Sequence, residues 1–123
     1  VSLPLEEYGI YAIFALPLGD TPLDQLKKEI DEEIVALKSD LISEKDYQKL
    51  QNIYENNFVN SNASIQGVAT SLSQYYLFYN DTNLINSSIE IYKSITREEI
   101  RDVASKYLND NQRVVMDYLP ENK

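Results

Sequence analysis

The sequence predicts an α+β fold, because a strand-like segment stands at each end of a series of amphipathic helices. The first segment runs from Tyr8 to Leu16 and is an apolar run rich in aromatic and β-branched residues. The last covers residues 112–119, where apolar and polar residues alternate as in a half-buried strand. Between them, apolar residues recur at the helical steps of three and four. With 123 residues, 43% of them hydrophobic, we expect residues 1–123 to form one domain.

The first helix is expected directly after a turn at residues 18–20. Thr21 is suited to cap this helix, and Pro22 is suited to its first position. Its apolar stripe has helical spacing and consists of Leu23, Leu26, Ile30, Ile34 and Leu37. Charged residues fall elsewhere on the helix, so we expect about four turns of amphipathic helix lying on a core.

Two further helices are expected one after the other. The first should begin after the capping residue Ser43, and its apolar stripe consists of Tyr47, Leu50, Tyr54 and Phe58. The stripe of the second consists of Ile65, Val68, Leu72, Tyr76 and Tyr79. Residues 56–62 between them are poor in helix formers, which predicts a break or a kink there.

A turn at residues 80–83 precedes a shorter helix that begins near Leu84. Thr96 and Glu99 have the spacing of a capping box, which predicts the start of the last helix. The buried face expected for this helix consists of Ile100, Val103, Ala104, Tyr107 and Leu108. Residues 109–111 should end it, and Pro120 should stop the strand that follows.

The composition excludes several classes of function. A net charge of −9 argues against nucleic-acid binding, since a phosphate-binding face needs clustered Lys and Arg. The chain contains no Cys and no His, which removes thiolate metal sites, cysteine nucleophiles and the commonest general base. The longest apolar stretch, residues 8–18, is shorter than the roughly 20 residues that span a bilayer. Because the first residue is Val1, we expect a processed or truncated piece of a longer chain, and the residues indicate no compartment.

Two clusters of residues carry a functional and a structural interpretation. The acidic residues Glu6, Glu7, Glu29, Asp31, Glu32 and Glu33 suggest a metal or acid–base site, but a solvated helix face explains them better. The ten tyrosines suggest a platform for a sugar or a peptide, but their helical spacing favours core positions. We therefore predict no catalytic, cofactor-binding or metal-binding residue in this chain.

Several short strings, in this order, resemble the C-terminal half of one domain of the M16 zinc metallopeptidases, the pitrilysin, insulinase or processing-peptidase-like family. Each string is weak alone, but their order and spacing are specific, and together they cover nearly the whole chain. They are Tyr8-Gly9-Ile10-Tyr11, Ile30 to Ile34, Leu41 to Asp46, Leu77 to Asp81, Ile95 to Ile100, Ala104 to Leu108 and Val114 to Pro120.

The resemblance implies several helices packed on one face of a small, mainly antiparallel sheet, as in half of an M16-type domain. Family members cut peptides inside a chamber, using zinc held by an inverted His-x-x-Glu-His helix. This chain has no His and cannot supply that motif, so zinc is expected in the catalytic domain of the parent protein. The Arg and Tyr that hold the substrate carbonyl in the family would precede Val1, and none of Arg97, Arg101 and Arg113 fits their motif.

The leading hypothesis is a non-catalytic segment of an M16-like peptidase that forms part of the chamber enclosing the peptide substrate. The alternatives are a stand-alone helical protein-interaction module and a structural subunit of a peptidase-like complex. The expected partners are the remainder of the same peptidase chain or a partner subunit. The resemblance also implies that the Tyr8–Leu16 strand has lost a neighbour, so self-association through its edge is expected.

Overall fold

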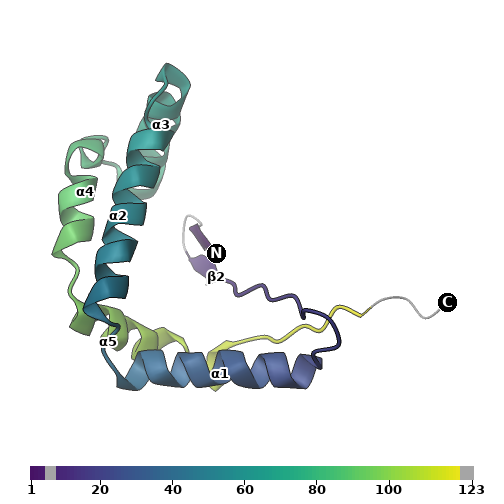
Figure 1. The fold of residues 1–123 in the computed structure, drawn as a ribbon. Helices are drawn as coiled ribbons and strands as arrows, with labels where there is room; N and C mark the ends of the chain where they lie inside the picture. Colours follow the sequence, from purple (N-terminus) through teal and green to yellow (C-terminus); the bar gives the residue numbers. More distant parts are fainter. Residues whose placement is uncertain (5–7, 120–123) are drawn as a thin grey trace. The chain divides into compact units, whose positions relative to one another are not determined.

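Helices make up most of the structure, a computed structural model that describes residues 1–4 and 8–119 (Figure 1). Within these residues, the elements are β1 (Ser2–Pro4), β2 (Gly9–Tyr11), α1 (Leu23–Ser39), α2 (Glu44–Ser61), α3 (Ile65–Tyr79), α4 (Leu84–Ser94), α5 (Arg97–Tyr107) and the 3₁₀ turn η1 (Asp110–Gln112). The expected α+β class is therefore wrong, because the described part of the chain is mainly helical.

The expected sheet covered by helices is also absent from residues 1–4 and 8–119. β1 and β2 pair only with each other, as an antiparallel hairpin in which Ser2 lies opposite Tyr11 and Leu3 opposite Ile10. The three residues of β2 are exposed. The strand expected from Tyr8 to Leu16 is thus reduced to three residues, because a strand needs a neighbour to satisfy its backbone groups.

The expected C-terminal strand does not form. After η1, residues 113–119 have no regular secondary structure, and Tyr118 is 98% exposed. Apolar and polar residues alternate along this segment, but no described strand pairs with it. Pro120, which was expected to close it, lies outside the described residues.

The described chain falls into two compact units. One combines the described parts of Val1–Phe14 with Ser43–Thr96, and we call it the hairpin–α2–α4 unit. The other combines Ala15–Ile42 with the residues from Arg97 onward, and we call it the α1–α5 unit.

In the α1–α5 unit, the expected apolar stripe of α1 is half-buried, and α1 packs on α5. Ala104, with 5% exposure, is the one apolar residue that is buried among those whose burial the structure describes. The buried face of α5 is narrower than expected, because Val103 and Tyr107 are more than half exposed. α1 begins at Leu23, one residue after Pro22, and the Thr21 hydroxyl donates to Leu18 O at 2.8 Å instead of capping the helix.

Hydrogen bonds link the C-terminal end of α1 to the C-terminal end of α5. Lys38 Nζ donates to Leu108 O at 3.2 Å and to Asn109 Oδ1 at 3.1 Å. In return, the Ser105 hydroxyl donates to Lys38 O at 3.2 Å. These bonds satisfy carbonyl groups at the C-terminal ends of both helices, where the helix itself offers no donor.

In the hairpin–α2–α4 unit, Ser43 caps α2 as expected, because its hydroxyl accepts from Asp46 N at 3.1 Å. The expected break between the tandem helices is confirmed but is shorter, since α2 continues through Asn60 to Ser61. α3 then begins after Ser64, whose hydroxyl accepts from Gly67 N at 3.0 Å.

The turn expected after α3 is also present. Asn80 ends the helix in the left-handed conformation, with φ of 54°, which Asn tolerates better than most residues. Asp81 Oδ1 then accepts from Asn83 N at 2.9 Å, directly before α4 begins at Leu84. α4 packs on both α2 and α3.

Candidate functional site

Aromatic side chains join α2 to α4. The rings of Tyr54 and Tyr92 are parallel, with centroids 3.7 Å apart, and Phe58 lies 6.5 Å from Tyr54 on the same stripe of α2. At the edge of this contact, Lys93 Nζ lies 2.7 Å from Glu55 Oε2. These aromatic residues are half-buried between helices, which agrees with the core interpretation of their spacing.

A chain of hydrogen bonds continues from this contact toward the start of α2. Gln51, which is 9% exposed, donates from Nε2 to the Tyr47 hydroxyl at 2.5 Å and to Lys93 O at 3.3 Å. The Tyr47 hydroxyl donates in turn to Ile95 O at 2.7 Å. Gln51 was not predicted from the sequence, although its position four residues after Tyr47 on the apolar stripe was an available signal.

Tyr54 has a structural role in this interface, where its ring stacks on that of Tyr92. Burial raises the pKa of the Tyr54 phenol above its ordinary value near 10. The hydroxyl therefore stays protonated at neutral pH, and it cannot serve there as a base or as a nucleophile.

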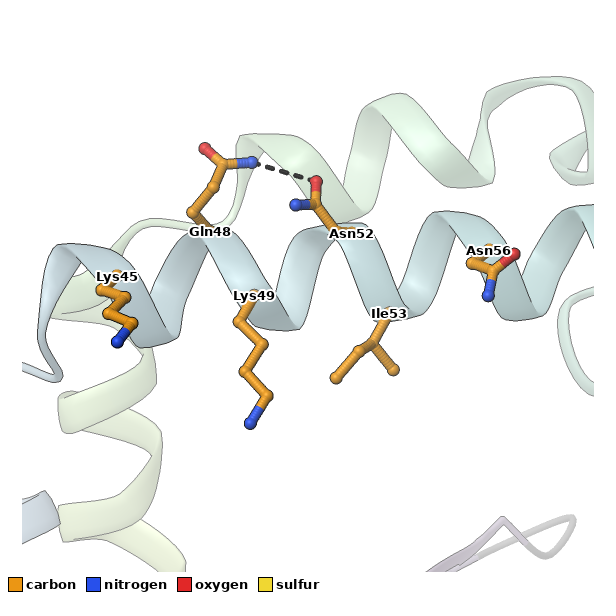
Figure 2. A pocket seen from close by; sticks show the side chains of 6 residues that line it. All are labelled: Lys45, Gln48, Lys49, Asn52, Ile53 and Asn56. Carbon is orange, nitrogen blue, oxygen red and sulfur yellow. Dashed lines mark hydrogen bonds between the residues drawn. The ribbon is translucent and has the colours of Figure 1, made fainter.

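An open groove lies along the exposed side of α2 (Figure 2). All of its lining residues belong to this single helix, and they are Lys45, Gln48, Lys49, Asn52, Ile53 and Asn56. Figure 2 shows the side chains of Lys45, Lys49 and Ile53 extending from the same side of α2, and Gln48 Nε2 donates to Asn52 Oδ1 at 3.2 Å. Because no second element closes over these residues, the groove offers a ligand little burial.

Two acidic residues of α1, Glu29 and Glu32, each pair with a side chain one turn away. Glu29 Oε1 accepts from Gln25 Nε2 at 2.9 Å, and Lys28 Nζ lies 3.7 Å from Glu32 Oε1 one turn away. In residues 1–4 and 8–119, no group of three or more acidic side chains is arranged to hold a metal ion. Glu6 and Glu7, the other members of the expected cluster, lie outside the described residues.

Asp31 makes the long-range ion pair of the α1–α5 unit. Its carboxylate accepts from the guanidinium of Arg113, a residue in the extended C-terminal segment, and Arg113 also lies 3.3 Å from Asp110. Hydrogen bonding from Arg113 lowers the pKa of Asp31 and raises that of Arg113. This pair holds the start of the C-terminal segment on α1, which is a positioning role.

Large apolar side chains remain exposed on α3 and on the N-terminal run. α3 carries no charged residue, and its exposed side includes Ile65 (92% exposed), Tyr76 (63%) and Tyr79 (63%). The core interpretation therefore holds for Tyr54 and Tyr75 but fails for Tyr76 and Tyr79. Apolar helix faces of this kind normally pack against another part of a protein.

No helix in the described residues is both long and apolar enough to cross a membrane. Comparisons with family models, with curated proteins and with solved structures give no match to this chain.

Proposed function

We propose that this chain is a non-catalytic segment of an M16-like zinc peptidase and forms part of the wall of its peptide-enclosing chamber. The observation that carries the proposal is the ordered series of strings that begins at Tyr8 and ends at Pro120. The zinc and the residues that activate water on it would belong to another domain of the parent protein.

The side chains of this segment support a wall better than a reactive site. With no imidazole and no thiol, the chain has only carboxylates as strong zinc ligands, and three of those on α1, Glu29, Asp31 and Glu32, contact other side chains. No step of peptide hydrolysis is therefore assigned to its residues. The apolar residues exposed on α3 would be buried against the remainder of the parent protein or a partner subunit.

A second candidate is a helical protein-interaction module, alone or as a structural subunit of a peptidase-like complex. The observation that favours it is the uncharged surface of α3, where Tyr76, Leu77 and Tyr79 are each more than 60% exposed. Aromatic residues with an apolar ring and a polar hydroxyl are enriched at protein interfaces.

One experiment separates the two candidates. The complete open reading frame is determined, and the encoded protein is assayed for zinc-dependent cleavage of an unfolded fluorogenic peptide, with and without residues 1–123. The peptidase proposal expects a His-x-x-Glu-His motif upstream of Val1 and activity that is lost on deletion and restored by adding the separate 123-residue chain. A frame without that motif, or activity unaffected by the deletion, refutes it.

A further inference from the structure

β2 has one paired edge and one open edge. Val1 N donates to Ala12 O at 2.8 Å, and Ala12 N donates to Val1 O at 2.9 Å, so these two residues form a hydrogen-bonded pair. Bonded and non-bonded pairs alternate along an antiparallel ladder, which makes Ser2–Tyr11 a non-bonded pair. The backbone N–H and C=O of Tyr11 therefore point away from β1, as do those of Gly9.

The outer edge of β1 is a poorer place for another strand. By the same alternation, the backbone groups of Ser2 and Pro4 point outward from β1. Proline has no N–H, so this edge lacks one of the two donors that a new strand would need. The hairpin therefore offers one good edge, that of β2.

We propose that the open edge of β2 pairs antiparallel with β2 of a second copy of this chain, about a two-fold axis at Tyr11. In this register, Tyr11 lies opposite Tyr11 of the second copy, and Gly9 lies opposite Ile13 in both directions. The result is a four-stranded antiparallel sheet in which the two β2 strands are central. The proline on β1 ends the sheet at both sides, so a closed dimer forms and not a fibre.

The charge pattern favours a second copy as the partner. Residues 8–18 contain no Asp, Glu, Lys or Arg, although the whole chain carries a net charge of −9. Two copies can therefore meet along this run without placing like charges opposite each other. The side chains that the new pairing would cover are exposed, with Tyr11 at 62% and Phe14 at 81%.

The size of the hairpin favours the addition of strands. β1 and β2 have three residues each, and an isolated two-stranded hairpin is only marginally stable in water. Three or more strands with an apolar face are stable, so pairing of two hairpins supplies what each lacks. The inference does not depend on the peptidase proposal, since it concerns only the edge of β2.

The first test is sedimentation of the 123-residue chain over a range of concentrations, with Tyr11→Pro and Ser2→Pro as matched variants. Tyr11→Pro removes an outward N–H from the open edge, whereas Ser2→Pro removes an outward N–H from the opposite edge of the same hairpin. Losing two symmetry-related hydrogen bonds should raise the dimer dissociation constant about thirty-fold in Tyr11→Pro. Ser2→Pro should leave it unchanged.

The second test uses the absence of cysteine in the chain. Directly opposed residues in a bonded antiparallel pair have Cα atoms about 5.5 Å apart, within the range of a disulfide. Mild oxidation of Tyr11→Cys should therefore give a covalent dimer, and Ser2→Cys, one strand farther from the axis, should not.

Each other outcome overturns the proposal. A chain that stays monomeric at high concentration has no such pairing, and a dimer that survives Tyr11→Pro uses another surface. If Tyr11→Pro and Ser2→Pro weaken dimerisation equally, the dimer requires the hairpin as a whole and not the β2 edge. If Tyr11→Cys forms no intermolecular disulfide in the complete encoded protein, the edge is occupied there by a different strand.

Discussion

The junction between α2 and α3 depends on the absence of a side chain at Gly67. A Cβ atom built on Gly67 would lie 1.9 Å from Ser61 O and 3.0 Å from Ser61 C, at the end of α2. Both of these atoms belong to the backbone, so the contact cannot be relieved by rotating a flexible side chain. The turn between the two helices is therefore as tight as a glycine allows.

Two opposing effects decide the result of Gly67→Ala. In a helix without this contact, alanine is favoured over glycine by about 1 kcal/mol. Here the contact of 1.9 Å has to grow by about 1.1 Å to reach 3.0 Å, the closest that real Cβ atoms approach. Overpacking of this kind costs about 2 kcal/mol, and displacement of the Ser64 cap costs about 1 kcal/mol more. We therefore expect a net loss of about 2 kcal/mol in the free energy of unfolding.

The assay is urea unfolding of both proteins followed by far-UV circular dichroism. Gln66→Ala is the matched control, since it changes an exposed neighbour on the same turn of α3 and should alter stability by less than about 0.5 kcal/mol. If Gly67→Ala unfolds at a higher urea concentration than the unchanged chain, helix propensity outweighs the close approach to Ser61 and the reasoning is refuted.

Three further changes test the contacts within each unit. Tyr92→Ala should lower the free energy of unfolding by about 2 kcal/mol in urea titrations because it removes the stacked ring, whereas Tyr76→Ala on the exposed side should change it little. Lys38→Met should cost about 1 kcal/mol in the same titration, since it removes two hydrogen bonds to the end of α5. Because Arg113 lowers the pKa of Asp31, the stabilising contact between the two should be present above about pH 4 and lost as the pH falls through the folded-state pKa. NMR signals of the C-terminal segment should report this acid transition, and Asp31→Asn should abolish it.

The helices could be predicted from the sequence because their signals are local. Ser43 and the stripe of α1 act within a few residues, and the turn at residues 80–83 begins with an Asn that can adopt a left-handed conformation. The cap at Ser64 was missed since the polar run 56–62 suggested a longer break than the chain needs. Gln51 was missed because a polar residue on an apolar stripe indicates a partner only once the neighbouring helix is known.

The strands could not be predicted in the same way because a strand depends on a neighbour distant in sequence. Alternation at residues 112–119 describes how side chains would point if the segment were extended, and it says nothing about which backbone would pair with it. In residues 1–4 and 8–119, β2 pairs only with β1, the other arm of the same hairpin, and the backbone pairing ends at Ala12. The family resemblance implied a larger sheet, but the described residues contain no strands besides β1 and β2 to form it.

The distribution of charge explains why the candidate surfaces lie where they do. Between Glu55 and Asp81 no charged side chain occurs, and this uncharged stretch includes all of α3. The other long uncharged stretch is the run of residues 8–18, which contains β2. Because the chain has a net charge of −9, two copies avoid contacts between like charges most easily along such stretches. Association should therefore use β2 or α3, and a partner that binds either one should do so with little dependence on salt, because few ion pairs would form in the interface.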